Sequence, residues 1–477
     1  MARYLTTTLP YVNADPHLGH ALEFVQADFV ARALRARGEE VLLNIGTDEH
    51  GAKVAKRAEE AGQEPGAYVD FYAARFKEFA EKLDISFDSF IRTTDPHHVE
   101  AAQEFWKRCD AAGDIYKAAY EVKYCVGCEL EKTDSELADG ICPLHPNLEI
   151  ELRSEENYYF RFSKYGPALL KLYESDPGFV LPDERMREVK AFVAAGLKDF
   201  SVSRRKEKLS WGVPVPGDDE HVMYVWFDAL VNYVSAIGWP DDDERFQKWW
   251  PVTQFAGKDN LRQQAAMWQA MLMSAGVPCS ERIFIHGFIT AGGRKMSKSL
   301  GNSVSPFSIL ERYGVDTLRY ALLRHVNPFE DSDLTEAMIG EYYTAHLSNG
   351  LGNLVARVMK LAEEHLPHPL ELSGEDEAFA PAFLERIDAY RFNEAMDFVF
   401  AKISEADQFM TERAPYKGIK SGDAVIREEA RADIAELVKR LASVATHLTP
   451  AMPRTAAAIL SAIRKNQKPE NLFPRLA

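Results

Sequence analysis

The sequence predicts an α/β protein in which a parallel sheet is split by an insertion and followed by an all-α helical bundle. A strand, helix, strand pattern opens the chain, a second α/β stretch begins near residue 252, and the pattern is almost wholly helical after about residue 305. With 477 residues, 46% of them hydrophobic and 27% charged, the chain is long enough for two or more domains.

The first α/β unit is predicted at the N-terminus. Residues 3–8 form a β-branched run, residues 18–37 carry apolar side chains at helical spacing until Gly38, and residues 41–46 form a second apolar run. Such a βαβ unit makes a parallel sheet with a right-handed crossover, and its ligands bind beyond the carboxyl ends of the strands. The segments "LPYVNADPHLGH" and "GTDEHG" are expected at that edge.

The second unit consists of "VTQFAGKDN" as strand and loop, residues 261–274 as a helix, and "RIFIHGF" as a strand. The segment between the two halves is rich in aromatic residues and holds three of the five cysteines. We expect a first half of the split α/β domain at 1–114, an inserted domain at 115–221, a second half at 222–290, a segment that holds the loop "KMSKS" at 291–345 and the helical domain at 346–477.

Charge and cysteine content limit the class of protein. Lysine and arginine number 56 against 73 aspartate and glutamate, a net charge of -17, so any RNA contact must use local basic patches. No stretch is long and apolar enough to span a membrane, and the N-terminus indicates a strand instead of a signal peptide. Five cysteines do not indicate a disulfide framework, and a cytoplasmic protein is expected.

Two histidines stand close together in "PHLGHALEF". If Asp15 caps the following helix and Pro16 takes its first position, His17 and His20 lie one turn apart near the positive helix end. That end attracts phosphate, and two imidazole donors there could stabilise a phosphoryl group under attack, with Gly19 leaving room for a flat base. Capping or packing histidines remain the alternative, and no third ligand nearby favours zinc.

A second phosphate-directed motif is "GGRKMSKSLGN" at 292–302. Lys295 and Lys298 lie three residues apart, with Ser297 between them, in a glycine-flanked loop that follows a strand. Lysines offer point charges to a triphosphate, although a solvated charged loop would have the same composition. Because this loop and the two histidines fall on one edge of one split sheet, together they favour nucleotide chemistry.

The insertion holds a metal-ligand pattern. Cys125 and Cys128, then Cys142 and His145, form two pairs separated by thirteen residues, as a closed tetrahedral zinc site requires. Free thiols or a disulfide are the alternatives in a cytoplasmic chain. Four protein ligands predict a single structural Zn²⁺ that holds the lobe together and does not activate water.

The motifs "HLGH" and "KMSKS", on a sheet split by an insertion and followed by a bundle, resemble those of the class I aminoacyl-tRNA synthetases. "TTLPYVNADPHLGH", "GTDEHG", "YVWFDALVNY" and "GKD" narrow the resemblance to the methionyl-tRNA synthetase family, over essentially the whole chain. The resemblance implies a Rossmann-type sheet and a methionine–tRNA ligase that uses ATP with Mg²⁺. Such an enzyme forms methionyl-adenylate and pyrophosphate, and then charges the 3'-terminal ribose of initiator and elongator tRNA(Met) for translation.

The same resemblance implies functional residues. The catalytic residues are His17, His20, Lys295 and Lys298. The ATP-binding residues are His17, Gly19, His20, Lys258, Asp259, Lys295, Ser297 and Lys298. The methionine-binding residues are Leu9, Tyr11, Asp48, Val225, Trp226, Ala229, Leu230, Tyr233, Gln264 and Trp268, and the anticodon-reading residues are Asn353, Arg357 and Tyr416. The family usually has histidine at 264, proline at 230 and tryptophan at 416, and a more apolar residue at 260.

Two further hypotheses remain. The first is a related synthetase, but those for isoleucine, leucine and valine carry a much longer editing insertion than this chain, and the cysteine enzyme uses its zinc at the amino acid. An RNA-binding or regulatory relative without catalysis is the other, but His17, Gly19, His20, Lys295 and Lys298 are all present. The chain ends at "NLFPRLA" without an added tRNA-binding module, so a monomer is expected.

Overall fold

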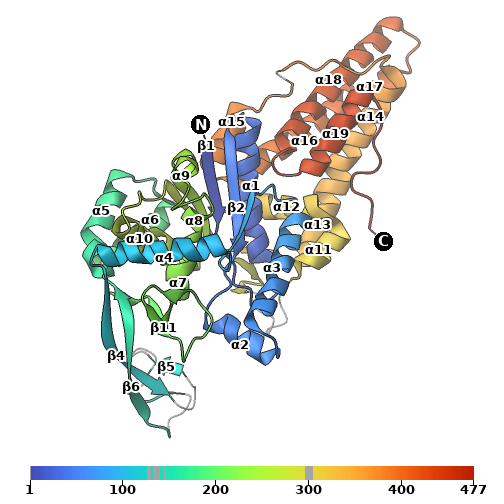
Figure 1. Cartoon of the computed structure of the whole chain (residues 1–477). Coiled ribbons are helices and arrows are strands. Elements are labelled where there is room, and N and C mark those ends of the chain that lie inside the picture. The colour runs from blue at the N-terminus through green and yellow to red at the C-terminus, as the bar shows by residue number, and fades with distance from the viewer. Residues whose placement is uncertain are drawn as a thin grey trace.

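The computed structural model describes residues 2–125, 130–132, 137, 140–143, 147–295, 304–374 and 376–476. A β-hairpin lobe extends from one end of the molecule, a central sheet with its helices occupies the middle, and a helical bundle extends from the other end (Figure 1). Among the described residues no helix is long and apolar enough to cross a membrane.

The central sheet has six strands, all parallel, in the order β3-β2-β1-β12-β13-β7. They are β1 (Ala2–Thr7), β2 (Glu40–Thr47), β3 (Ser89–Arg92), β7 (Val180–Leu181), β12 (Val252–Gly257) and β13 (Arg282–His286). Helix α1 (Leu18–Ala36) joins β1 to β2, as predicted. The strand order reverses between β1 and β12, so the carboxyl ends of these two strands form the switch point of the sheet.

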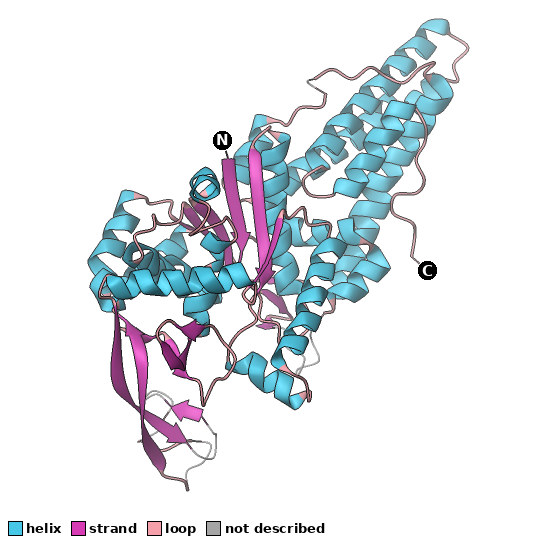
Figure 2. Ribbon diagram, viewed as in Figure 1, coloured by secondary structure: helices cyan, strands magenta, loops and turns pink. Residues whose placement is uncertain are grey.

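Helices cover the sheet on both faces (Figure 2). They include α2 (Ala52–Glu60), α3 (Pro65–Lys82) and α4 (Pro96–Ala111). Helix α1 is buried along most of its length, because its hydrophobic side chains contact the sheet on one side and the bundle on the other. Phe29 of α1, for example, makes edge contacts with Phe383 and Phe392 at 6.4 and 5.7 Å. The sheet and the bundle therefore share one hydrophobic core.

The segment 115–221 contains a long hairpin and an edge strand of the central sheet. Strands β4 (Ile115–Cys125) and β6 (Ile150–Phe160) pair antiparallel over their whole length, flanked by β5 (Leu130–Lys132) and β8 (Phe200–Ser201). Helices α5 (Gly166–Ser175) and α6 (Asp183–Ala194) follow, and β7 between them pairs with β13. A small sheet of β9 (Ser203–Arg205), β10 (Pro214–Val215) and β11 (Asp218–Met223) ends the segment.

The second half of the catalytic region contains α7 (Val225–Leu230), α8 (Asn232–Ser235) and α9 (Asp243–Trp249). The helix expected at 261–274 is present but is not uniform. A π-helical turn occupies Gln263–Met267, and α10 covers Trp268–Ser274. The carbonyl of Gln264 accepts a hydrogen bond from Gln269 Nε2 at 2.9 Å, and that of Ala265 accepts from the Tyr173 hydroxyl at 2.6 Å. Side chains thus satisfy two of the carbonyls of this turn.

The last part of the chain is helical, as predicted. Strands β14 (Ile289–Ala291), β15 (Arg294–Lys295) and β16 (Ser332–Asp333) form a small sheet, and a series of helices begins after β15, with β16 between its second and third members. They are α11 (Pro306–Tyr313), α12 (Val315–Arg324), α13 (Glu336–Tyr342), a π-helix (Tyr343–Gly352), α14 (Asn353–His365), α15 (Pro381–Asp388), α16 (Phe392–Arg413), α17 (Pro415–Gly418), α18 (Ala424–Leu448) and α19 (Pro453–Lys465).

Arg319 on α12 connects the bundle to the central sheet region. Its fully buried guanidinium pairs with Asp28 of α1 at 2.7 Å and donates to the carbonyl of Leu83 at 3.1 Å. On the bundle side it donates to the carbonyls of Ala451 and Pro450 at 2.7 and 2.9 Å. A single side chain therefore bonds to both parts, in addition to their shared hydrophobic contacts.

Candidate active site

A pocket of about 730 Å³ opens at the switch point between β1 and β12. The ends of β1, β12 and β13, the start of α1, and helices α7 and α8 all contribute side chains to it. Most of the residues that the sequence assigned to ATP and methionine line this pocket. They are Leu9, Tyr11, His17, Gly19, His20, Asp48, Trp226, Ala229, Leu230, Tyr233, Asp259 and Gln264. Residues up to 255 positions apart in the chain are thus brought together at the predicted edge.

The start of α1 differs from the prediction in its cap. His17, and not Asp15, is the N-cap, and Leu18 is the first helical residue. His17 Nδ1 accepts from the Gly19 amide at 3.1 Å, while His20 Nδ1 accepts from the His17 amide at 3.3 Å, which forms a reciprocal capping box. Asp15 is unavailable as a cap because its carboxylate pairs with Arg75 at 2.6 Å.

The capping box determines which ring nitrogen carries the proton when each imidazole is neutral. The rings of His17 and His20 stack with centroids 3.7 Å apart. Because each Nδ1 accepts a hydrogen bond from an amide, the ring proton of each neutral imidazole is assigned to Nε2. Burial, and next the neighbouring His17, hold the pKa of His20 well below its ordinary value, so His20 is neutral. Two stacked imidazoles therefore present Nε2–H donors at the positive end of α1.

Gly19 is constrained by His17 itself. A Cβ at Gly19 would lie 2.9 Å from Cε1 of the His17 ring, closer than carbon atoms normally approach. The glycine therefore allows the ring to fold back over the first turn and cap the helix. Gly19 also lines the pocket, as expected for a residue beside a flat base.

Three buried oxygen acceptors without a hydrogen-bond partner among the described residues line the pocket. They are Asp48 Oδ1, Asn232 Oδ1 and Gln263 Oε1. Burial, and next the charge of Asp228, raise the pKa of Asp48 well above its ordinary value. A carboxylate and two amide oxygens without donors suit a ligand that carries an ammonium group. Asn232 and Gln263 were not predicted, although Asn232 lies within "YVWFDALVNY".

Asp228 behind Asp48 is held by two buried histidines. His50 Nδ1 lies 2.7 Å from one carboxylate oxygen, and His98 Nε2 lies 2.9 Å from the other. Burial alone would raise the pKa of Asp228, but the charge and hydrogen bonds of His50 and His98 lower it to about 2. The negative charge of Asp228 is therefore permanent and adds to the attraction for a cation near Asp48.

Tyr233 lies beside the apolar part of the pocket lining. Its hydroxyl accepts from Gln264 Nε2 at 2.9 Å, and burial raises its pKa, so the hydroxyl keeps its proton at neutral pH. Trp268, fully buried, contacts the Tyr233 ring edge to face at 5.9 Å from behind. Val225 is also behind the surface, against Gly51. Of the ten predicted methionine residues, Val225 and Trp268 support the lining and the others form it.

A buried pair that was not predicted, Glu23 and His286, also lines the pocket. Glu23 accepts from the amide and hydroxyl of Thr8, both at 2.6 Å, and from His286 Nε2 at 3.0 Å. The other nitrogen of His286 lies 2.8 Å from the carbonyl of Gly287. Burial lowers the pKa of His286, but the hydrogen bond and charge of Glu23 outweigh burial and leave it raised. Both ring nitrogens face acceptors, which favours the imidazolium.

Lys258 lies in the chain between two residues that line the pocket, Gly257 and Asp259. Lys258 is not among the lining residues; it pairs with Asp331 at 2.7 Å. Lys295 ends β15, and Asp333 anchors this hairpin by accepting from the Gly293 amide at 2.9 and 3.0 Å and from the Thr290 hydroxyl. Ser297 and Lys298 lie outside the described residues.

The predicted zinc ligands are only partly within the described residues. Cys125 ends β4 and pairs in register with Leu130 of β5, and Cys142 is fully buried. Cys128 and His145 lie outside the described residues. Three aliphatic residues of this lobe, Ile141, Leu148 and Leu152, are 45%, 43% and 64% exposed. The described part of the lobe therefore buries Cys142 without using these side chains as a core.

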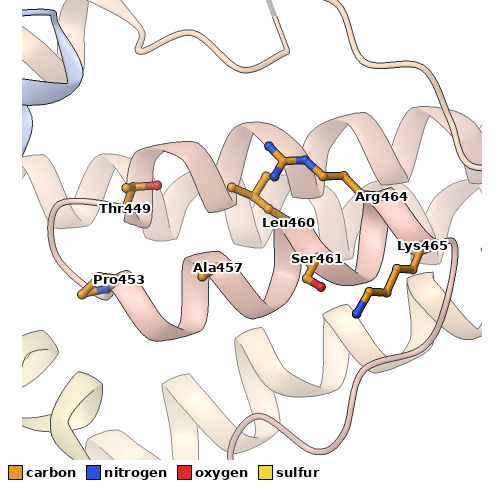
Figure 3. Close-up of a pocket in the computed structure, with 7 residues that line it drawn as sticks. All are labelled: Thr449, Pro453, Ala457, Leu460, Ser461, Arg464 and Lys465. Carbon is orange, nitrogen blue, oxygen red and sulfur yellow. The ribbon is translucent and has the colours of Figure 1, made fainter.

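The predicted anticodon residues lie on the bundle. Asn353 and Arg357 are one turn apart at the start of α14, and Arg357 pairs with Asp407 of α16 at 3.0 Å. Tyr416 on α17 is 37% exposed, with Lys417 Nζ 5.8 Å from its ring. A second pocket, of about 360 Å³, lies between the end of α18 and α19 (Figure 3). Its lining residues are Thr449, Pro453, Ala457, Leu460, Ser461, Arg464 and Lys465, none of them buried, so it lacks the enclosed polar groups of the first pocket.

Paired imidazoles at the start of the first crossover helix, in a parallel sheet split by an insertion, are the arrangement of the class I aminoacyl-tRNA synthetases. The family model described as tRNA synthetases class I (M) matches residues 3–147 and 135–359. The chain belongs to this family.

Individual relatives agree with the family match. Methionine–tRNA ligases of Thermosynechococcus vestitus and Mesorhizobium japonicum are 40% and 41% identical to the chain, over 95% and 96% of it and 88% and 90% of their own lengths. A solved structure of Mycobacterium tuberculosis methionyl-tRNA synthetase in complex with methionyl-adenylate is similar with a TM-score of 0.86 and 36% identity. That match covers 100% of this chain and 99% of the other.

Proposed function

We infer that the protein is an ATP-dependent methionine–tRNA ligase. The observation that carries this inference is one pocket lined by the imidazoles of His17 and His20, by Asp48, whose Oδ1 is buried without a hydrogen-bond partner among the described residues, and by Tyr233 with its hydroxyl. Phosphate, ammonium and thioether can thus be bound together. The relatives named methionine–tRNA ligase and the family match support the same activity.

The reaction has two steps. A carboxylate oxygen of methionine attacks the α-phosphorus of ATP, the new bond forms methionyl-adenylate, and pyrophosphate leaves. A 3'-terminal ribose hydroxyl of tRNA(Met) then attacks the carbonyl carbon, AMP leaves with the bonding electrons, and the hydroxyl proton is released. Both nucleophiles belong to substrates, so the protein supplies positioning and charge stabilisation.

For the first step we assign the charge stabilisation to His17, His20, Lys295 and Lys298. The two imidazoles donate from Nε2 to the phosphoryl oxygens, and neutrality of His20 does not prevent this because a neutral ring still carries one N–H. Gly19, Lys258, Asp259 and Ser297 complete the proposed ATP contacts. Mg²⁺ bound to the ATP phosphates would neutralise charge on the leaving pyrophosphate.

For methionine, we propose that Asp48 binds the ammonium, supported by Asn232 and Gln263. Asp48 Oδ1 is buried and receives no hydrogen bond from the residues that the structure describes, which is costly unless a cation completes the site. The remaining contacts are proposed to be apolar or aromatic, with Tyr233 donating to the sulfur. They involve Leu9, Tyr11, Val225, Trp226, Ala229, Leu230, Tyr233, Gln264 and Trp268.

We propose one structural Zn²⁺ held by Cys125, Cys128, Cys142 and His145. The donor set suits zinc, and the burial of Cys142 beside exposed aliphatic residues supports a lobe held by a metal and not by its own hydrophobic core. We retain the division of the chain at 1–114, 115–221, 222–290, 291–345 and 346–477, with β7 of the second segment completing the central sheet.

For tRNA, we propose that Asn353 and Arg357 bond to anticodon bases while Tyr416 stacks on one. Polar and aromatic side chains at the surface of helices α14 and α17 suit splayed bases. We further propose a cytoplasmic monomer that charges both initiator and elongator tRNA(Met).

Amino-acid-dependent ATP–pyrophosphate exchange with each of the twenty amino acids tests the assignment. We expect exchange with methionine alone, followed by charging of tRNA(Met) in a separate aminoacylation assay. Exchange with another amino acid would reassign the substrate. No exchange with any amino acid would leave only the non-catalytic RNA-binding hypothesis and overturn the proposal.

A further inference from the structure

Five buried side chains form a continuous line of hydrogen bonds that ends at the proposed sulfur position. They are Tyr233, Gln264, Gln254, Ser280 and Gln269, all between 0% and 6% exposed. They come from α8, the π-helical turn, β12, the turn before β13, and α10. Five separate elements thus converge on one polar line inside an otherwise apolar core.

The line begins at backbone groups, in which the N–H is always the donor and the carbonyl always the acceptor. The Ser280 amide donates to Gln269 Oε1 at 3.0 Å, so that oxygen must be the acceptor and the other end of the side chain must be the donor. Gln269 Nε2 accordingly donates to the carbonyl of Gln264 at 2.9 Å and to the Ser280 hydroxyl at 3.1 Å. Two backbone groups therefore fix the orientation of the Gln269 amide.

The orientation passes from Gln269 to the pocket. The Ser280 hydroxyl accepts from Gln269 and donates its single proton to Gln254 Oε1 at 2.7 Å. Gln254 Nε2 then donates to Gln264 Oε1 at 2.8 Å, and Gln264 Nε2 donates to the Tyr233 hydroxyl at 2.9 Å. In this orientation each side chain of the line, from Gln269 to Gln264, donates to the next one.

The last group in the line faces the pocket. Tyr233 and Gln264 line it, whereas Gln254, Ser280 and Gln269 do not. Since the Tyr233 oxygen accepts from Gln264, and no described residue accepts the hydroxyl proton, that proton is left for a ligand. If Gln254 and Gln264 were both reversed, Tyr233 would donate to Gln264 and offer the ligand no proton.

We propose that Gln254, Ser280 and Gln269 are positioning residues that hold Gln264 and Tyr233 so that the Tyr233 hydroxyl donates to a thioether sulfur. This assignment rests on the proposed function. Its effect is on selectivity: the relay favours a side chain with a sulfur acceptor over one with a methylene at the same place. None of the five side chains titrates near neutral pH, so this selectivity is independent of pH.

The test compares methionine with norleucine, in which a methylene replaces the sulfur, by ATP–pyrophosphate exchange. In Ser280→Ala the hydroxyl that transmits the orientation is lost. We expect kcat/KM for methionine to fall roughly tenfold, the worth of about one hydrogen bond, while the value for norleucine stays within about twofold. Gln254→Met, which removes the amide at similar volume, is expected to lower the methionine-to-norleucine ratio in the same way.

Ser274→Ala is the matched control. Ser274 also loses a buried hydroxyl bond, to Asp114 at 2.8 Å, at the end of α10, but it is not part of the line. We expect it to leave the ratio unchanged. Equal losses for both amino acids in Ser280→Ala, or no loss, would overturn the relay. If the wild-type protein exchanges with neither amino acid, the proposed function fails instead.

Discussion

Replacing Arg319 with methionine should uncouple the bundle from the catalytic region. The guanidinium and its partner Asp28 are both fully buried, and three backbone carbonyls also depend on this side chain. Asp28 keeps its bonds to Arg32 at 2.7 Å and to the Ser86 amide at 2.7 Å, so its charge is not left alone. The loss is therefore mainly the three carbonyls at about 1 kcal/mol each plus part of one ion pair, about 3–5 kcal/mol in total.

The tryptophans provide a selective measurement. All seven lie between residues 106 and 268, in the catalytic half and the insertion, and none lies in the bundle. Tryptophan fluorescence thus follows unfolding of the catalytic half in urea, whereas circular dichroism follows mainly the helices. We expect coincident transitions for the wild type. For Arg319→Met the circular dichroism transition should move to lower urea and precede the fluorescence transition.

Arg32→Met is the control for this experiment. Arg32 pairs with the same Asp28 carboxylate, but its other hydrogen bond goes to the carbonyl of Asp84, which also belongs to the catalytic half. It should lower stability without separating the transitions. Arg319→Met should also lower tRNA charging more than pyrophosphate exchange, since the pocket is intact while the bundle is less well placed. Coincident transitions at the wild-type midpoint in Arg319→Met would refute the reasoning.

Four further changes test the site. Burial raises the pKa of Asp48, so the carboxylate protonates as pH falls through that raised value. The KM for methionine should therefore rise toward low pH in the wild type, and it should be high and independent of pH in Asp48→Asn. A wild-type KM that falls as pH is lowered would contradict this. Gly19→Ala should slow adenylate formation about tenfold by displacing His17, at unchanged thermal midpoint, because alanine favours the helix; wild-type rates would disprove the steric argument. Lys298→Ala should slow adenylate formation about a hundredfold while methionine affinity, measured by equilibrium binding, changes less than about twofold; an equal loss of affinity would exclude a role at the phosphates. Elemental analysis should find one zinc per native chain and none in Cys125→Ala, and a metal-free native protein would refute the zinc site.

The periodic elements could be predicted from sequence because their signals are local. The strand and helix spacing at 3–8, 18–37 and 41–46 was confirmed as β1, α1 and β2. Placing both motifs at one sheet edge followed from the topology of parallel strands and was confirmed for the residues around His17 and Asp48.

The remainder depended on contacts between distant residues. Asp15 was predicted to cap α1, but Arg75, sixty residues away, takes its carboxylate. The π-helical turn is stabilised by Gln269 and Tyr173, and a helical pattern in sequence carries no sign of them. Strand β7 has two residues and therefore no period to detect. Glu23 and His286 are 263 residues apart, so their pairing could not be inferred from spacing.

The capping box at α1 has a consequence for how the enzyme can vary. The same two imidazoles that we propose to bind the nucleotide also cap the N-terminus of α1, each through its Nδ1 atom. A substitution that alters the chemistry of either ring also frays the first turn, so catalytic tuning and folding cannot be selected separately at these positions. We therefore expect natural variation to collect in the relay behind Tyr233, where substrate preference can change without disturbing the start of the fold.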